Sequence, residues 1–248
     1  MILTKPQEYE KYLECGRIAK EALDTGIKSL RVGINTLEVN NICAQVIQKY
    51  GATPSFLNYD NGDGVYPFAS CVCVNEELVH ALPSKTKILK SGDIVTIDLG
   101  VFYNGFHTDL SYTKEIETKN QDYFLNVGKN SLRDAIKQAI VGNYIGDVSQ
   151  AMQKAVEDAN FTVSVDLVGH GIGKKLHEKP QVPCFGRKKS GEKLIEGMVL
   201  AIEVMYMKGK SGIKIGKDGF AYVTKDGSLS AQFEHTVIVQ KDQPIILA

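Results

Sequence analysis

The chain has 248 residues, of which 43% are hydrophobic, and its 29 basic and 29 acidic side chains give a net charge of zero. A chain of this size can bury a full hydrophobic core. The balanced charge argues against nucleic acid or a membrane surface as a partner, and no apolar run is long enough to span a membrane.

The cysteines are odd in number and lack the paired spacing of a zinc site. They are Cys15, Cys43, Cys71, Cys73 and Cys184. No apolar leader precedes the first predicted helix, and nothing indicates a disulfide framework. We therefore expect a reduced, cytoplasmic protein, with a monomer as the simplest state.

The first part of the chain predicts two helices followed by a loop and a strand. Apolar residues at helical spacing predict a helix over Pro6–Leu30. Thr36 is the expected N-cap of a second helix, which ends at Tyr50. The loop Asn58–Gly64 is interpreted as a surface loop, with a flap over a site as the alternative. A strand is expected over Ser70–Asn75.

A β-hairpin is predicted over Gly92–Thr113. Apolar and polar residues alternate along it, and Asn104-Gly105 favours a hairpin turn because both turn positions need positive φ. Asp98 and Asp109 lie within its two strands. A buried carboxylate is costly unless it has a partner. The two aspartates therefore indicate either a shared metal or a solvent-exposed hairpin.

Two further helices and a strand follow the hairpin. The pattern predicts a helix over Asp122–Val141, and a second helix that Asp147 caps and that runs to Ala159. Phe161–Val165 is strand-like.

The last two predicted strands are Met198–Met205 and Ala231–Val239. Two helices followed by strands thus occur twice, in halves of about residues 6–115 and 118–240. The halves share little sequence identity, so we expect an architectural repeat within one domain, residues 1–248.

Two basic stretches raise the question of an RNA or ribosome contact. They are Arg187-Lys188-Lys189 and the group Lys208, Lys210, Lys214 and Lys217. Both lie in turn-rich segments without interleaved aromatic residues, so solvated turns explain them better. A ribosome contact remains the alternative.

His170 stands apart from the other histidines because glycines surround it. Gly169, Gly171 and Gly173 argue against a helix and allow tight turns and close backbone approach. His177 follows in the same segment. In an unbroken strand the two side chains would face opposite ways, so only a bend can bring both into one cavity.

Two glutamates, Glu203 and Glu234, lie in the last predicted strands among apolar residues. With Asp98 and Asp109 they would place four negative charges together, which repel strongly unless cations neutralise them. Two divalent ions would do so, and carboxylates with one imidazole suit Mn²⁺, Co²⁺, Fe²⁺ or Zn²⁺. Two such ions can activate a shared water for hydrolysis.

The surrounding motifs resemble those of the methionine aminopeptidases in their short, type I, bacterial form. They are GDIVTIDLG, GFHTD, GHGIG, HEKPQVP, GMVLAIE and SAQFEHT, and the match covers nearly the whole chain. The resemblance implies an α+β pita-bread (creatinase/aminopeptidase) fold with two pseudo-symmetric α/β lobes around a central antiparallel sheet. It also implies removal of the initiator methionine from nascent chains with a small second residue.

The resemblance assigns a role to each candidate metal ligand. Asp98 would bind one metal ion, Asp109 and Glu234 would bridge two, and His170 and Glu203 would bind the second. Glu203 would also act as the general base.

The other roles implied by the resemblance concern histidines and the substrate pocket. His177 would contact the scissile carbonyl and stabilise the oxyanion, and His80 would hydrogen-bond the substrate backbone. Strand alternation, and not the resemblance, predicts that His107 shares a face with Asp109 and lies behind the ligands, and that His235 points away from Glu234 and is structural. The expected walls of the methionine pocket are Tyr66, Cys71, Leu176 and Phe220.

The sequence departs from the family pattern at four positions. Ala81 replaces a usual glycine, and Val204 replaces a usual proline, so the turn expected after Glu203 is less rigid. Leu176 and Phe220 replace larger aromatic residues. None of these departures removes a metal ligand. We therefore expect them to affect the rate, the metal preference or the shape of the pocket.

Two other functions remain as alternatives. A proline-specific aminopeptidase or creatinase-like hydrolase of the same fold usually carries an extra N-terminal domain, which this sequence does not show. A non-catalytic pita-bread module that binds peptides typically loses metal ligands, whereas all five are present here.

Overall fold

The structure is a computed structural model that describes residues 1–60, 62 and 64–248. The predicted loop Asn58–Gly64 includes positions 61 and 63, which lie outside the described residues. The helices are α1 (Pro6–Ser29), α2 (Thr36–Lys49), α3 (Asp122–Ile136) and α4 (Ile145–Glu157). The strands are β1 (Thr53–Pro54), β2 (Ser70–Val74), β3 (Glu77–Val79), β4 (Ile94–Tyr103), β5 (Phe106–Glu115), β6 (Thr162–Val163), β7 (Val168–Gly171), β8 (Glu178–Pro183), β9 (Val199–Met207), β10 (Ile213–Ile215), β11 (Tyr222–Thr224), β12 (Ser230–Ile238) and β13 (Ile245–Ile246).

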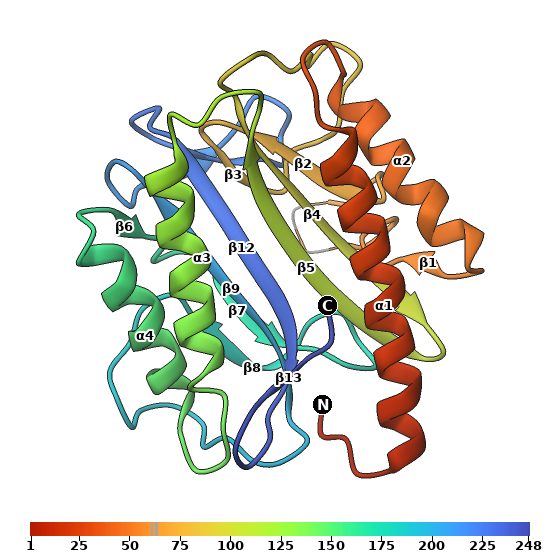
Figure 1. The fold of residues 1–248 in the computed structure, drawn as a ribbon, viewed down its shortest axis with the longest axis vertical. Helices are drawn as coiled ribbons and strands as arrows, with labels where there is room; N and C mark the ends of the chain where they lie inside the picture. Colours follow the sequence, from red (N-terminus) through yellow and green to blue (C-terminus); the bar gives the residue numbers. More distant parts are fainter. Residues whose placement is uncertain (61, 63) are drawn as a thin grey trace.

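A large antiparallel sheet forms the centre of the molecule (Figure 1). Within the described residues its main path has the order β1-β4-β5-β12-β9-β7-β8, with β2 beside β4, β6 beside β9 and β13 beside β12. A smaller sheet has the order β10-β11-β3. The α+β class with a central antiparallel sheet, predicted from the resemblance, is confirmed.

The helices lie on one face of the large sheet (Figure 1). Helix α1 packs against β4 and β5, and α3 packs against β9 and β12. On β4, Val95, Ile97 and Leu99 are buried in the same apolar cluster as the inner side of α1. Because strand side chains alternate, Asp98 and its neighbours on the other parity point to the opposite face. None of the helices in the described ranges has the length and apolar character of a membrane span.

The predicted β-hairpin is confirmed and is formed by β4 and β5. Asn104 and Gly105 have φ values of 51° and 87°, as the two turn positions require. The register pairs Gly100 with Asp109 and Asp98 with Ser111. The turn therefore fixes how the two aspartates are staggered along the hairpin.

Several predicted element ends were wrong. Asn35, and not Thr36, caps α2: its side chain accepts a hydrogen bond from the Glu38 backbone N–H at 2.9 Å. Asp147 is already inside α4 and accepts from the Tyr144 backbone N–H at 2.9 Å.

Two predicted elements are shorter in the structure. The helix predicted to reach Val141 ends at Ile136, because residues beyond it form tighter turns such as Gln138 N–H to Ala135 C=O. The strand predicted over Phe161–Val165 is reduced to β6, because only Thr162 and Val163 are in register with residues of β9.

Candidate metal centre

The five candidate ligands come from five neighbouring strands of the sheet. In sheet order they are Asp98 on β4, Asp109 on β5, Glu234 on β12, Glu203 on β9 and His170 on β7. The β4–β5 hairpin and three later strands therefore each bring one ligand-type side chain per strand to the middle of the sheet.

The strand register places the acidic residues in one row. Asp98 lies opposite Ser111, Ser111 opposite Glu234, and Glu234 opposite Glu203. Residues directly opposite each other in an antiparallel sheet share a face. Asp109 lies two positions before Ser111, so it shares that face as well.

His170 joins the row from the next strand. It pairs with Ala201, two positions before Glu203, so its side chain lies on the same face as the glutamate. Its Nδ1 lies 2.9 Å from the Gly171 carbonyl oxygen. A neutral imidazole that donates from Nδ1 leaves Nε2 free as a ligand atom. Burial lowers the pKa of His170 to about 3, which favours the neutral form.

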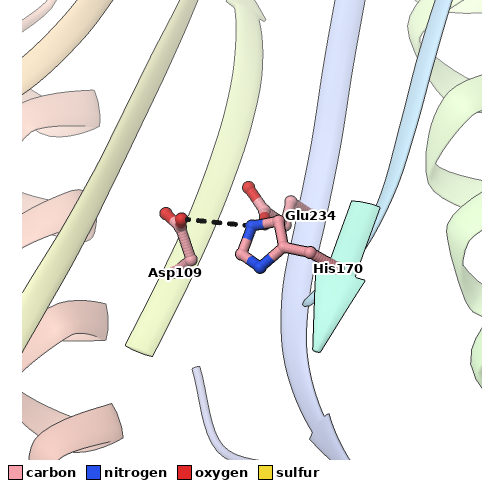
Figure 2. A group of neighbouring side chains, drawn as sticks. All are labelled: Asp109, His170 and Glu234. Atoms are coloured by element: carbon pink, nitrogen blue, oxygen red, sulfur yellow. Dashed lines mark ion pairs between the residues drawn. The ribbon is translucent and has the colours of Figure 1, made fainter. Parts of the chain in front are cut away.

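Three of these side chains converge closely. Figure 2 shows Asp109, His170 and Glu234 pointing toward one another from separate strands. One potential ligand atom from each lies within 4.8 Å of the others, and His170 Nε2 is 3.8 Å from Asp109 Oδ2. Asp98 and Glu203 line the same cavity, which has a volume of about 940 Å³. The five predicted ligands are thus brought together.

The chemistry of the cluster fits a bound cation. All four carboxylates are at least 93% buried. Asp98 Oδ1, Asp109 Oδ1 and Glu234 Oε1 have no hydrogen-bond partner among the described residues. Buried charge without a partner is costly. Oxygen atoms with one neutral imidazole are a common ligand set for divalent transition metals.

The pKa values of the four carboxyl groups also indicate that the cluster needs positive charge. Burial raises the pKa of Asp98 to about 7. Burial, followed by the charges of Asp98 and Glu203, raises the pKa of Asp109 well above its ordinary value. The pKa values of Glu203 and Glu234 are raised for the same reasons. A divalent ion would reverse this balance by favouring the ionised carboxylates.

Comparison with known proteins decides the family. A model of metallopeptidase family M24 matches residues 10–241. The chain belongs to metallopeptidase family M24. A methionine aminopeptidase from Clostridium acetobutylicum is 37% identical over 100% of this chain and 98% of its own length. The crystal structure of methionine aminopeptidase from Thermotoga maritima has a TM-score of 0.94 and 38% identity, and covers 100% of this chain and 99% of that one.

The fold of this chain is also found in proteins with much lower sequence identity. Prolidase from Pyrococcus furiosus has a TM-score of 0.78 at 21% identity, and this chain covers 65% of it. That likeness concerns the fold alone. The pita-bread fold and the resemblance to short methionine aminopeptidases, both expected from the sequence, are confirmed. Family membership and the buried cluster together support the use of a divalent metal.

Two residues that contact the candidate metal ligands were not identified from the sequence. Gln232 Nε2 donates to Glu203 Oε2 at 3.1 Å and lies 3.5 Å from Glu234 Oε2. Its spacing of two from Glu234 was a usable signal. The Thr236 hydroxyl accepts from the Asp109 backbone N–H at 2.8 Å and donates to the Asp109 carbonyl oxygen at 2.7 Å. These contacts fix the two glutamates and the β5–β12 register.

The predicted bend brings His177 to His170. A register irregularity follows His170, the chain returns as β8, and the two rings lie 4.4 Å apart edge to face. His80 also lines the cavity and has a φ of 62°. His107 is not among the described lining residues, and its Nδ1 lies 2.9 Å from the Ser55 hydroxyl. His235 Nδ1 lies 2.6 Å from the Ala248 carbonyl oxygen.

Three of the four residues predicted to form the walls of the methionine pocket line the cavity. Tyr66, Cys71 and Leu176 line the cavity. Phe220 is not among the lining residues and packs edge to face against Tyr66, with ring centroids 5.9 Å apart. The cavity wall instead includes Phe56.

Two of the family departures can be located in the fold. Val204 pairs with Phe233 and continues β9, so the turn expected after Glu203 is absent. Ala81 is fully buried, and its carbonyl oxygen accepts a hydrogen bond from the Tyr66 hydroxyl at 2.9 Å. The extra methyl group is therefore accommodated in a buried apolar cluster that also contains the cavity residues Tyr66 and Cys71.

Proposed function

We propose that this protein removes the N-terminal methionine from nascent polypeptides and peptides whose second residue is small. The observation that carries the proposal is the cluster of four buried carboxylates and one neutral imidazole, in a chain that matches methionine aminopeptidases over its whole length. All five cysteines are free and buried, which fits a reducing compartment, so we propose that it acts in the cytoplasm.

We propose that the cluster holds two divalent ions, of Mn²⁺, Co²⁺, Fe²⁺ or Zn²⁺. Asp98 would bind one ion, Asp109 and Glu234 would bridge both, and His170 and Glu203 would bind the other. Four carboxylates need two divalent ions for neutrality, which supports this number. When bound, such ions polarise the scissile carbonyl and lower the pKa of an attacking water.

The chain's own side chains supply the remaining steps. Glu203, inside the cavity, would accept a proton from the attacking water and pass it to the leaving amine. His177 would donate a hydrogen bond to the oxygen that becomes negative during attack. His80 would hydrogen-bond the substrate backbone beyond the scissile bond. All three line the same cavity.

The apolar part of the cavity would select methionine. Phe56, Tyr66, Cys71 and Leu176 line it. Each buried methylene group is worth about 0.8 kcal/mol. A long thioether side chain is therefore bound better than a short aliphatic one.

A peptide panel tests this function. With Mn²⁺ or Co²⁺ added, we expect release of the first residue from a Met-Ala peptide at least about tenfold faster than from Leu-Ala or Ala-Pro peptides, because apolar pockets discriminate by about 10- to 200-fold. Met-Leu should also be cleaved more slowly than Met-Ala, because the proposed preference is for a small second residue. Chromatographic measurement of the released amino acid gives kcat/KM for each. Preferred cleavage of Ala-Pro would instead indicate a proline-specific enzyme, and no cleavage would indicate a binding module.

Replacing His177 by alanine should lower kcat about 10²- to 10³-fold while the metal content stays unchanged, since an oxyanion donor is lost and no ligand is removed. Peptide kinetics and elemental analysis of the same sample measure both quantities. His235→Ala is the matched control, because that imidazole is on the opposite face of the sheet by strand alternation. Loss of metal from the His177 variant would make this residue a ligand and contradict its assigned role.

A further inference from the structure

A tyrosine contacts His177 directly within the cavity. The Tyr59 hydroxyl lies 2.8 Å from His177 Nδ1, and the two rings meet edge to face with centroids 5.0 Å apart. Both side chains line the cavity. Tyr59 therefore contacts His177 through Nδ1, and Nε2 stays available for another partner.

The backbone of Tyr59 is held at the base of its loop. Its N–H donates to the Phe56 carbonyl oxygen at 3.0 Å, and its own carbonyl accepts from the Tyr66 N–H at 2.9 Å. The adjacent Asp60 forms a bridge with Val65. These contacts fix the backbone position of Tyr59, so its side chain approaches His177 from a defined point.

The backbone around His177 is held by contacts that do not involve Tyr59. Glu178 Oε1 accepts a hydrogen bond from the Lys175 N–H at 2.9 Å. Glu178 Oε2 forms an ion pair with the Met1 amino group at 2.9 Å. Removing the Tyr59 hydroxyl should therefore leave the His177 backbone in place and free only its imidazole ring.

We propose that Tyr59 is a positioning residue for His177, whose hydroxyl donates to Nδ1 and keeps the imidazole in the tautomer with a proton on Nε2. A neutral imidazole carries one N–H, so a ring that accepts at Nδ1 must donate from Nε2. Nε2–H is then the group that meets the developing oxyanion, and this step rests on the proposed function. Burial, then the charge of Asp109, raises the pKa of Tyr59, so the phenol remains a donor.

The tautomer can be read without any turnover. In metal-free protein with ¹⁵N-labelled histidine, we expect the His177 spectrum to show an unprotonated Nδ1 and a protonated Nε2, with the signals assigned from His177→Ala. Tyr59→Phe should give a mixture of tautomers. Tyr66→Phe is the matched control, because its hydroxyl donates to the Ala81 and Ser70 carbonyl oxygens instead. A protonated Nδ1 in the wild type, or unchanged signals in Tyr59→Phe, would overturn the proposal.

A double-mutant cycle tests the same link during catalysis. Tyr59→Phe should lower kcat about tenfold, the size of one hydrogen bond, with KM nearly unchanged. In a His177→Ala background the same change should have no further effect, because Tyr59 acts through that ring. An equal loss in both backgrounds would make Tyr59 merely structural. If the wild type releases no methionine, the proposed function fails, while the ¹⁵N spectra still decide the role of Tyr59.

Discussion

Replacing Asp109 by asparagine is expected to lower kcat by at least about 10⁴-fold, because Lewis-acid catalysis contributes several kcal/mol and each 1.36 kcal/mol is tenfold in rate. Asp109 lies on β5, between the strands that carry Asp98 and Glu234, and its Oδ2 is 3.8 Å from His170 Nε2. An amide offers one neutral oxygen where the carboxylate offers two charged ones, so it cannot bridge two cations well. Release of methionine from a Met-Ala peptide at saturating Mn²⁺ measures the loss.

The same substitution should not unfold the chain. In the metal-free protein Asp109 is buried beside Asp98 and Glu203, whose charges repel it. An asparagine cannot ionise, so the cost of placing a further charge in this buried cluster is removed, and the metal-free variant should melt at or above the temperature of the metal-free wild type. Asp158→Asn, the same change in an exposed ion pair with Lys154 just after the end of α4, should leave turnover unchanged. Near-normal turnover of Asp109→Asn would count against its bridging role, and a much lower melting temperature would place its effect in folding.

The candidate ligands were visible in the sequence because their residue types conflict with their surroundings. Asp98 and Glu203 interrupt runs of apolar strand residues, and only a strong partner can offset the free-energy cost of burying their carboxylates. Which strands lie side by side was not visible. Strand β12 inserts between β5 and β9, which chain order does not indicate. The register that aligns Glu234 with Glu203 therefore had to come from the structure.

Residues outside the strand pattern were harder to predict. Tyr59 belongs to a loop without periodicity, so nothing in the sequence indicates its contact with His177. Phe220 was assigned as a wall from the resemblance, but it is not among the lining residues and packs against the ring of Tyr66, which is. Thr36 failed as a cap because its hydroxyl accepts from the Ser84 N–H at 2.8 Å. The architectural repeat of the two halves stays a prediction.

Removing metal with a strong chelator is expected to lower peptide hydrolysis by at least about 10⁴-fold, and added Mn²⁺ or Co²⁺ should restore it, since the cluster itself holds no other electrophile. Activity before chelation, after chelation and after each metal addition measures the effect. A chelator that is itself saturated with Ca²⁺ serves as the control for non-specific inhibition. Activity that persists after complete chelation would refute the metal mechanism.

Metal removal should also change how stability depends on pH. The folded pKa of Asp98 is raised to about 7, so its contribution is present at low pH and is lost as pH rises through that value. Between about pH 5 and 7, the Asp98 carboxyl should therefore make the metal-free protein less stable, whereas the buried histidines, whose pKa values are lowered, act in the opposite direction in both samples. A bound ion needs ionised carboxylates, so the loaded protein should be more stable and should not lose stability over the same range. Thermal melts with and without Mn²⁺ at both pH values measure this difference. Equal slopes in the two samples would mean that the carboxylates do not hold a cation.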